Sequence, residues 1–326
     1  MIPAINDSDL ITKYSSLLKA NNVPIIFSIE HLSLLLGYSE ELLYRVSNSP
    51  RHFYREFEIP KKSGGMRKIS EPLPTLMEIQ HWLLRNIFEK AAVSKAARAY
   101  KKGNTLRGHA SIHTRQSFVL RIDLKDFFSS IKRFHVQKLI FEFGYTEQLS
   151  AIIASICCLN DSLPQGGPTS PAISNIYMKK FDENLLSLCR AERLRYSRYA
   201  DDLTLSGHIN PIHMIEKIKI CLEPFDLNIN HKKTLLMRKG SRQIVTGLTV
   251  NDFVSVGRNQ KRNFQQAAYY IQRFGLDGHM RKIGANKRNY LDHLIGVGGF
   301  IVHANPSDYK SAEMLRYLKE LKIIYS

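Results

Sequence analysis

The tetrapeptide Tyr199-Ala200-Asp201-Asp202 stands between two runs in which polar and apolar residues alternate. Residues 193–198 precede it and residues 203–207 follow it, a pattern that predicts the two arms of a β-hairpin with the acidic pair at its tip. Adjacent carboxylates repel each other and gain nothing from packing. Their placement at a hairpin tip therefore indicates that they bind a multivalent cation.

A second acidic segment lies upstream, where Asp123 falls at the end of a strand-like run within residues 119–128. Nucleotidyl transfer by two metal ions about 3.5–4 Å apart requires carboxylates that converge from different strands. A single aspartate is usually a solvated turn residue, but several in this arrangement favour phosphoryl or nucleotidyl transfer. The expected Mg²⁺ ligands are three carboxylates and one backbone carbonyl: Asp123, Asp201, Asp202, and either Ile122 or Leu124.

The composition indicates a polyanionic partner. Lys and Arg outnumber Asp and Glu by 47 to 29 in 326 residues, which gives a net charge of +18. Because the basic residues are spread along the chain, nucleic acid is favoured over an anionic membrane surface. The remaining alternative is a basic protein without a polyanionic ligand.

No segment reaches the roughly 20 apolar residues that span a bilayer, and residues 1–7 lack the features of a signal peptide. The cysteines, which we expect to be reduced and mostly buried, have no zinc-binding spacing. They are Cys157, Cys158, Cys189 and Cys221. We therefore expect a cytoplasmic protein without membrane contact.

Helices and short strands alternate without a βαβ rhythm, which predicts an α+β fold in which an antiparallel sheet carries the acids and helices lie behind it. The expected elements are a hairpin of residues 53–60 and 66–72, a helix over about 76–97, helices at 133–143 and 146–159, a strand near 244–250, and mostly helix from 260 onward. Ser170 is expected to cap the helix that follows the loop 163–171.

Several residues have the chemistry to bind a nucleoside triphosphate. Basic residues flank the Gly64-Gly65 tip of the first hairpin, which can bend over a triphosphate or simply be solvated. An aromatic ring five residues after Asp123 can lie under the incoming sugar and exclude a 2′-hydroxyl, although one ring of the Phe127-Phe128 pair is expected in the core. The expected nucleotide-binding residues are Lys62, Arg67, Asp126, Phe128, Gln165 and Gly166.

Lys233 is placed to donate a proton to the departing pyrophosphate, and an ordinary surface lysine is an equally good interpretation. Gly166 would allow the backbone to approach the nascent base pair closely, with Gln165 beside it.

These motifs, in this order, resemble those of a reverse transcriptase over roughly residues 25–250. The matching segments are Arg67, Asp123 with Phe128, Pro164-Gln165-Gly166 with Ser170-Pro171 and Asn175, Tyr199-Ala200-Asp201-Asp202, Lys233-Thr234, and Val245-Thr246-Gly247-Leu248 at the position of the primer grip. The resemblance implies a right-hand polymerase. Residues 1–115 would form the N-terminal helices and fingers, 116–250 the palm with fingers-side helices inserted at about 132–165, and 251–326 a small helical thumb.

Within that superfamily the chain is most similar to bacterial retron reverse transcriptases, because the thumb is compact and no maturase or endonuclease extension follows. Val245-Thr246-Gly247 resembles a retron motif that contacts structured RNA. The retron motif Asn-Ala-x-x-His is matched by residues 109–113, except that His109 replaces the asparagine.

The resemblance and the basic thumb together indicate the RNA-binding residues. These are His109, His113, Val245, Thr246, Gly247, Arg258, Lys261, Arg262, Arg281 and Lys282.

The resemblance also implies the reaction. One structured non-coding RNA would serve as template and primer, synthesis from dNTPs would start at a guanosine 2′-hydroxyl, and the product would be branched RNA-linked single-stranded DNA (msDNA). Such complexes act in anti-phage defence with an effector or toxin encoded nearby. The alternatives are a group II intron-like, diversity-generating or abortive-infection reverse transcriptase, a non-catalytic RNA-binding scaffold, and RNA-dependent RNA synthesis, which Phe128 disfavours.

Overall fold

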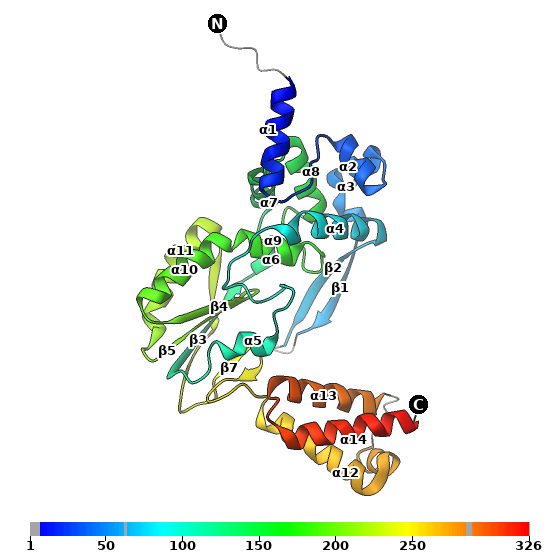
Figure 1. Ribbon diagram of the computed structural model, residues 1–326, viewed down its shortest axis with the longest axis vertical. Helices are drawn as coiled ribbons and strands as arrows, with labels where there is room; N and C mark the ends of the chain where they lie inside the picture. Colours follow the sequence, from blue (N-terminus) through cyan, green and yellow to red (C-terminus); the bar gives the residue numbers. More distant parts are fainter. Residues whose placement is uncertain (1–6, 62–63, 285–288, 326) are drawn as a thin grey trace.

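The computed structural model describes residues 7–61, 64–284 and 289–325. Its elements are a mixture of α-helices and antiparallel strands, as the sequence predicts. Figure 1 shows an elongated molecule with N-terminal helices at one end, a sheet in the middle and a group of C-terminal helices at the other end. In the described part of the chain, none of the helices has the length and apolar character needed to cross a membrane.

The N-terminal end consists of α1 (Asp7–Ala20), α2 (Ile29–Leu36) and α3 (Glu40–Asn48). The Oγ of Ser28 accepts a hydrogen bond from the backbone N–H of His31, which caps α2. Two further helices, α7 (Arg133–Glu142) and α8 (Glu147–Cys157), match the predicted pair and pack together, with α8 against α3.

The predicted first hairpin is confirmed, with β1 (Tyr54–Pro60) antiparallel to β2 (Met66–Pro72). The next helix, α4 (Pro74–Asn86), ends well before the predicted residue 97. The prediction was wrong because Ala96 to Arg98 pair with a strand instead: Arg198 N–H donates to Ala96 O, and Arg98 N–H donates to Arg198 O, both at 2.8 Å. Tertiary pairing here overrides helix propensity.

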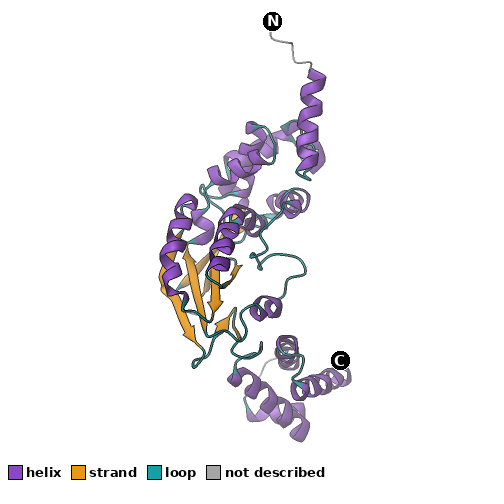
Figure 2. Cartoon of the chain, turned by 60° about the vertical axis from the view of Figure 1, so that its left-hand side comes forward, coloured by secondary structure: helices purple, strands orange, loops and turns teal. Residues whose placement is uncertain are grey.

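The central sheet has the strand order β4-β5-β3-β6, with every neighbouring pair antiparallel. Its strands are β3 (Phe118–Lys125), β4 (Arg195–Tyr199), β5 (Asp202–Gly207) and β6 (Asn228–Arg238). The helices α10 (Lys179–Ala191) and α11 (Met214–Leu222) pack against β4 and β6. Figure 2 shows helices lying against the sheet. Leu185, Leu205 and Ile218 are fully buried in this layer, so the sheet has the predicted helical backing.

Three short helices connect these layers: α5 (Leu106–Ser111), α6 (Phe127–Ser130) and α9 (Ser170–Tyr177). Thr169, not Ser170, is the residue before α9, and its side chain makes no capping hydrogen bond, so the predicted Ser170 cap was wrong. Pro171 lies in the first turn of α9, where its missing N–H costs nothing.

The C-terminal region has its own core. The segment predicted as one strand is a tight hairpin of β7 (Ile244–Val245) and β8 (Leu248–Thr249). The chain reverses because Thr246 and Gly247 both have positive φ, at 47° and 83°. This hairpin shares a hydrophobic core with α12 (Arg258–Lys282), α13 (Tyr290–Ala304) and α14 (Tyr309–Tyr325), the helices of Figure 1's lower end.

Candidate active site

The acidic tetrapeptide forms the predicted hairpin tip. Tyr199 pairs with Asp202 across β4 and β5, which leaves Ala200 and Asp201 as the turn. Ala200 has φ 56°, a left-handed conformation that typically costs a non-glycine residue about 1–3 kcal/mol. The carbonyl of Asp201 accepts a hydrogen bond of 2.9 Å from the N–H of Leu124, which fixes the tip against β3.

Asp123 lies beside this tip, because it is paired with Asp202 in the register of β3 and β5. Two residues of β6 hold its carboxylate: Lys233 Nζ lies 3.0 Å from Oδ1, and Asn230 Nδ2 donates to Oδ2 at 3.0 Å. A register shift between β3 and β6 bypasses Ile122, next to Asp123. The sheet therefore brings together the predicted acids and the predicted proton donor.

Burial, reinforced by repulsion between neighbouring carboxylates, raises the pKa of two of these carboxyl groups. Burial, then the neighbouring Asp201 carboxylate, raises the pKa of Asp202 to about 6. Burial also raises the pKa of Asp201, and Asp123 adds to the effect, while Lys233 and Arg67 oppose it. Clustered carboxylates whose ionisation is disfavoured are a donor set that fits a hard divalent cation.

The side chains are not arranged as a closed metal cage. Within the described residues, no three His, Cys, Asp or Glu side chains are gathered as ligands of a single ion. Asp123 is instead paired with Lys233, and Asp202 does not line the cavity that Asp123 and Asp201 line.

A cavity of about 730 Å³ opens in front of the acids. It lies between the β1–β2 hairpin, the end of β3 and the loop before α9. Predicted residues that line it are Arg67, Asp123, Leu124, Asp126, Phe128, Gln165, Asp201 and Lys233. Lys62 lies outside the described residues. Of the two carbonyl candidates, only Leu124 borders the cavity; Ile122 is fully buried and does not.

The two adjacent phenylalanines have separate environments. Both residues border the cavity, but Phe127 is buried in the core, whereas Phe128 is only partly buried. Asp126, directly before them, has φ 48° and precedes α6. One ring is therefore core, as expected, and the other is available to a bound nucleotide.

Gly166 lies against strand β2. A Cβ on this residue would lie 2.6 Å from the carbonyl oxygen of Ser70 in β2, and Gly166 has φ 129°. The adjacent Gln165 carbonyl accepts a hydrogen bond of 2.9 Å from Ser70 N–H. The glycine thus allows the loop to join β2. It is exposed beside Gln165, which borders the cavity, so its contact with a nascent base pair stays a prediction.

A buried ion pair supports the acidic hairpin. Arg198 and Asp182 are both fully buried, with Nη2 and Oδ2 2.8 Å apart. Arg198 also donates from Nη1 to the carbonyl of Ala200 and to Oδ1 of Asn175, while Tyr196 donates to Asp182. Arg198 and Asp182 were not among the residues predicted from the sequence, although a charged residue in a strand, directly before the tetrapeptide, was the available indication.

Tyr100 and Asn230 were also missed. Tyr100 borders the cavity, and burial raises its pKa, with the Asp201 carboxylate adding to the effect. Asn230 lies three residues before Lys233 in the sequence, but an amide alone gives no indication of its partner.

The two motif histidines are buried, so they cannot contact RNA directly, and that part of the prediction was wrong. His109 Nε2 and His113 Nε2 each lie 2.7 Å from Ser197 Oγ, and His113 Nδ1 lies 2.7 Å from Ser206 Oγ. The His109 ring stacks on Tyr199 with centroids 5.4 Å apart. Burial lowers the pKa of both rings, His109 to about 4, so both are neutral near pH 7.

This histidine chain reaches the β7–β8 turn. Thr246 Oγ1 lies 3.4 Å from His109 Nδ1, which connects Thr246 through His109 to Ser197 in β4. Val245 is fully buried in the second core, so its side chain is also excluded from RNA contact. Thr246 and Gly247 remain accessible at the turn.

The predicted thumb cations lie on α12 but are divided by a kink at Gly275, where φ is 72°. Lys261 is paired with Asp308 at 2.7 Å, and Lys282 lies over the ring of Tyr270. Arg258, Arg262 and Arg281 are exposed. The structure therefore does not gather the five cations into one straight row.

Comparison with known proteins identifies the family. The profile of "Reverse transcriptase (RNA-dependent DNA polymerase)" matches residues 59–282. The chain is 30% identical to the retron Mx65 reverse transcriptase of Myxococcus xanthus, over 87% of this chain and 70% of that protein. The chain belongs to the retron reverse transcriptases. This retron reverse transcriptase is also 28% identical to retron Ec86 reverse transcriptase of Escherichia coli, over 93% of this chain and 92% of that protein.

Among solved structures, this retron reverse transcriptase resembles telomerase from Candida albicans with a TM-score of 0.48 and 12% identity, over 82% of this chain and 63% of that chain. The family assignment makes the chain an RNA-directed DNA polymerase by class, as the motifs predicted, and it opposes the group II intron-like, diversity-generating and abortive-infection alternatives.

Proposed function

We propose that this enzyme copies a structured non-coding RNA into single-stranded DNA that stays joined to the RNA by a branch at a guanosine 2′-hydroxyl. The observation that carries the proposal is the convergence of Asp123, Asp201 and Lys233 on a cavity that Arg67 and Phe128 also line. We further infer the right-hand arrangement: fingers within 1–115, palm within 116–250 with helices inserted at about 132–165, and thumb within 251–326.

Asp123, Asp201 and Asp202 would hold two Mg²⁺ ions with the carbonyl of Leu124, and these ions would activate the attacking hydroxyl and stabilise the pyrophosphate. The clustering of the carboxyl groups, with burial raising the pKa of Asp201 and Asp202, supports this assignment. Because Lys233 Nζ lies 3.0 Å from Asp123, its ammonium is held where it can neutralise or protonate a leaving group.

Other residues that line the cavity would position the dNTP. The guanidinium of Arg67 lies on the hairpin side of the cavity, where it would bind triphosphate oxygens in bidentate fashion. The ring of Phe128 would pack below the sugar and exclude a 2′-hydroxyl. Gln165 borders the same space and would contact the nascent base pair.

The proposed biological role rests on the family resemblance. The RNA–DNA product would act in the cytoplasm in anti-phage defence, with an effector or toxin protein encoded nearby. The net charge of +18 fits a protein that binds RNA.

Purification from the native host, followed by sequencing of the attached nucleic acid, tests the proposal. We expect DNA joined to RNA that a debranching enzyme releases from a single guanosine. Protein that purifies without such a hybrid would contradict it. An RNA-binding scaffold, the remaining alternative from another class, would yield RNA without attached DNA.

A further inference from the structure

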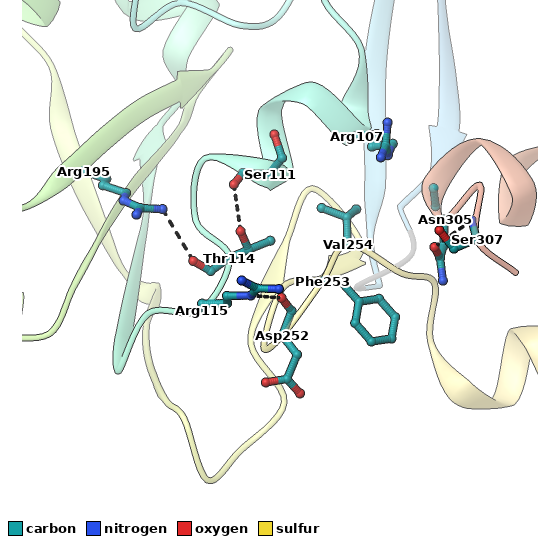
Figure 3. Close-up of a pocket in the computed structure, with 11 residues that line it drawn as sticks. Arg107, Ser111, Thr114, Arg115, Arg195, Asp252, Phe253, Val254, Asn305 and Ser307 are labelled. Carbon is teal, nitrogen blue, oxygen red and sulfur yellow. Dashed lines mark hydrogen bonds between the residues drawn. The ribbon is translucent and has the colours of Figure 1, made fainter.

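A second recess lies at the junction of the sheet and the C-terminal helices, and it shares no lining residue with the cavity of the acids. Its volume is about 480 Å³, within the range of small-ligand pockets. Four separate segments meet there: α5 with the residues that follow it up to Arg115, the start of β4, the loop after β8, and the loop between α13 and α14, as Figure 3 shows.

Positive charge dominates this recess. Arg107, Arg115 and Arg195 line it against one acidic residue, Asp252. Within the described residues, no carboxylate lies within ion-pair distance of these arginines. In Figure 3 the Asp252 carboxylate points away from Arg107. The three guanidinium groups therefore retain their charge for an external anion.

Backbone carbonyls, which do not neutralise charge, hold two of these guanidinium groups in place. Arg195 donates from Nη1 to the carbonyl of Ile112 at 2.7 Å, and Arg115 donates from Nε to the carbonyl of Asp252 at 3.1 Å. Fixing the groups in advance lowers the conformational entropy lost on binding. Their remaining N–H groups suit phosphate oxygens, which arginine binds in bidentate fashion.

An aromatic ring completes the recess. Phe253 is 59% exposed, and it lies in the same lining as Arg107 and Arg195. A single exposed phenylalanine is ordinary on a protein surface. A ring beside three arginines in a recess of this size has instead the parts that bind an unpaired nucleotide: cations for the phosphate and an aromatic face for the base.

We propose that this recess binds one unpaired nucleotide of the RNA, with its phosphate at Arg107, Arg115 and Arg195 and its base on Phe253. The inference rests on the proposed function, because that function supplies the RNA. Arg195 and Tyr199 are the two ends of β4, and four residues of a strand extend about 13 Å. The recess would thus anchor RNA within a few nucleotides of the acids.

The test measures binding of the full-length chain, freed of nucleic acid at high salt, to a fluorescein-labelled RNA stem-loop and to a fully paired duplex of equal length. Arg107→Glu and Phe253→Ala are the informative variants, since both side chains are exposed. The matched controls are Arg85→Glu on α4 and Phe141→Ala on α7, which are exposed residues outside the recess.

We expect both recess variants to weaken stem-loop binding at least about fivefold more than their controls. Fivefold is the lower end of the affinity lost with one stacked base. Duplex binding should change no more than in the controls. Equal effects of Arg107→Glu and Arg85→Glu, or an unchanged stem-loop preference in Phe253→Ala, would overturn the proposal. These outcomes are independent of whether the protein purifies with branched DNA, so the two proposals can fail separately.

Discussion

Arg198 donates from Nη1 to the carbonyl of Ala200 at 3.0 Å, directly behind the acidic tip. Ala200 is in the left-handed region, a conformation that persists only when its surroundings enforce it. The buried pair with Asp182 fixes the guanidinium, so the ion pair sets the geometry of the turn that carries Asp201.

Arg198→Lys should therefore impair catalysis beyond its effect on stability. Lysine keeps the charge but cannot contact Asp182, Asn175 and Ala200 together. Damage to a buried pair typically costs about 3–5 kcal/mol, so kcat should be measured well below the melting temperature. Arg190→Lys, at an exposed position on α10, is the matched control. A folded Arg198→Lys enzyme with the kcat of the wild type would refute the positioning role.

Phe128→Ala should increase incorporation of ribonucleotides relative to deoxyribonucleotides. Removing the ring opens the part of the cavity where a 2′-hydroxyl would clash, and steric discrimination of this kind is typically worth about tenfold or more. Single-nucleotide extension with matched rNTP and dNTP pairs measures the ratio. Phe127→Ala should instead destabilise the core without changing the ratio, because Phe127 is buried. An unchanged ratio in Phe128→Ala would show that the ring does not exclude the 2′-hydroxyl.

Lys233→Met should lower the rate of extension while leaving RNA binding unchanged, since Nζ contacts Asp123 in the cavity. Lost proton donation typically costs about 10²–10⁴-fold. Rapid-quench kinetics of a single addition measure the effect, and Lys232→Met, at the exposed neighbouring position, is the control. Equal extension rates for the two variants would show that Lys233 is an ordinary surface lysine and does not donate the proton.

The buried histidines predict a pH dependence of stability. Burial lowers the pKa of His109 to about 4, so between this value and its ordinary 6.5 the unfolded chain binds more protons at this position. The free energy of unfolding should therefore rise with pH up to about 6.5, by at most about 1.4 kcal/mol per pH unit for one histidine. Asp202 acts in the opposite direction, because its raised pKa makes the folded state bind the proton more tightly.

His109→Asn isolates the histidine contribution and introduces the residue found at this position of the retron motif. Melting curves from pH 4.5 to about 7.5 should show a shallower rise for the variant than for the wild type. Parallel curves would show that His109 does not titrate as its burial implies.

Local patterns in the sequence were sufficient for much of the site. Alternation around Tyr199 to Asp202 predicted the hairpin, and the end of the run at Asp123 predicted a neighbouring strand; both are confirmed. What local patterns could not give were long-range partners. Ala96 and Ala97 are not part of the predicted helix, because the chain there pairs with β4. Gly166 is required for the close contact of its loop with Ser70. His109 and His113 were predicted to contact RNA because they match a motif, and a motif does not reveal whether its side chains are buried.

Asp201→Asn tests the central claim most directly. The substitution keeps the size of the side chain and removes the charge that a metal ion needs. Because losing even a residue that only supports a metal ligand typically costs about 10–100-fold, primer extension should fall by at least that factor. The Kd for RNA should stay within about twofold of the Kd of Asp9→Asn, an exposed control on α1. A twofold difference is about the precision of such titrations. Extension by Asp201→Asn at the control rate would contradict the assignment of this hairpin as the catalytic centre.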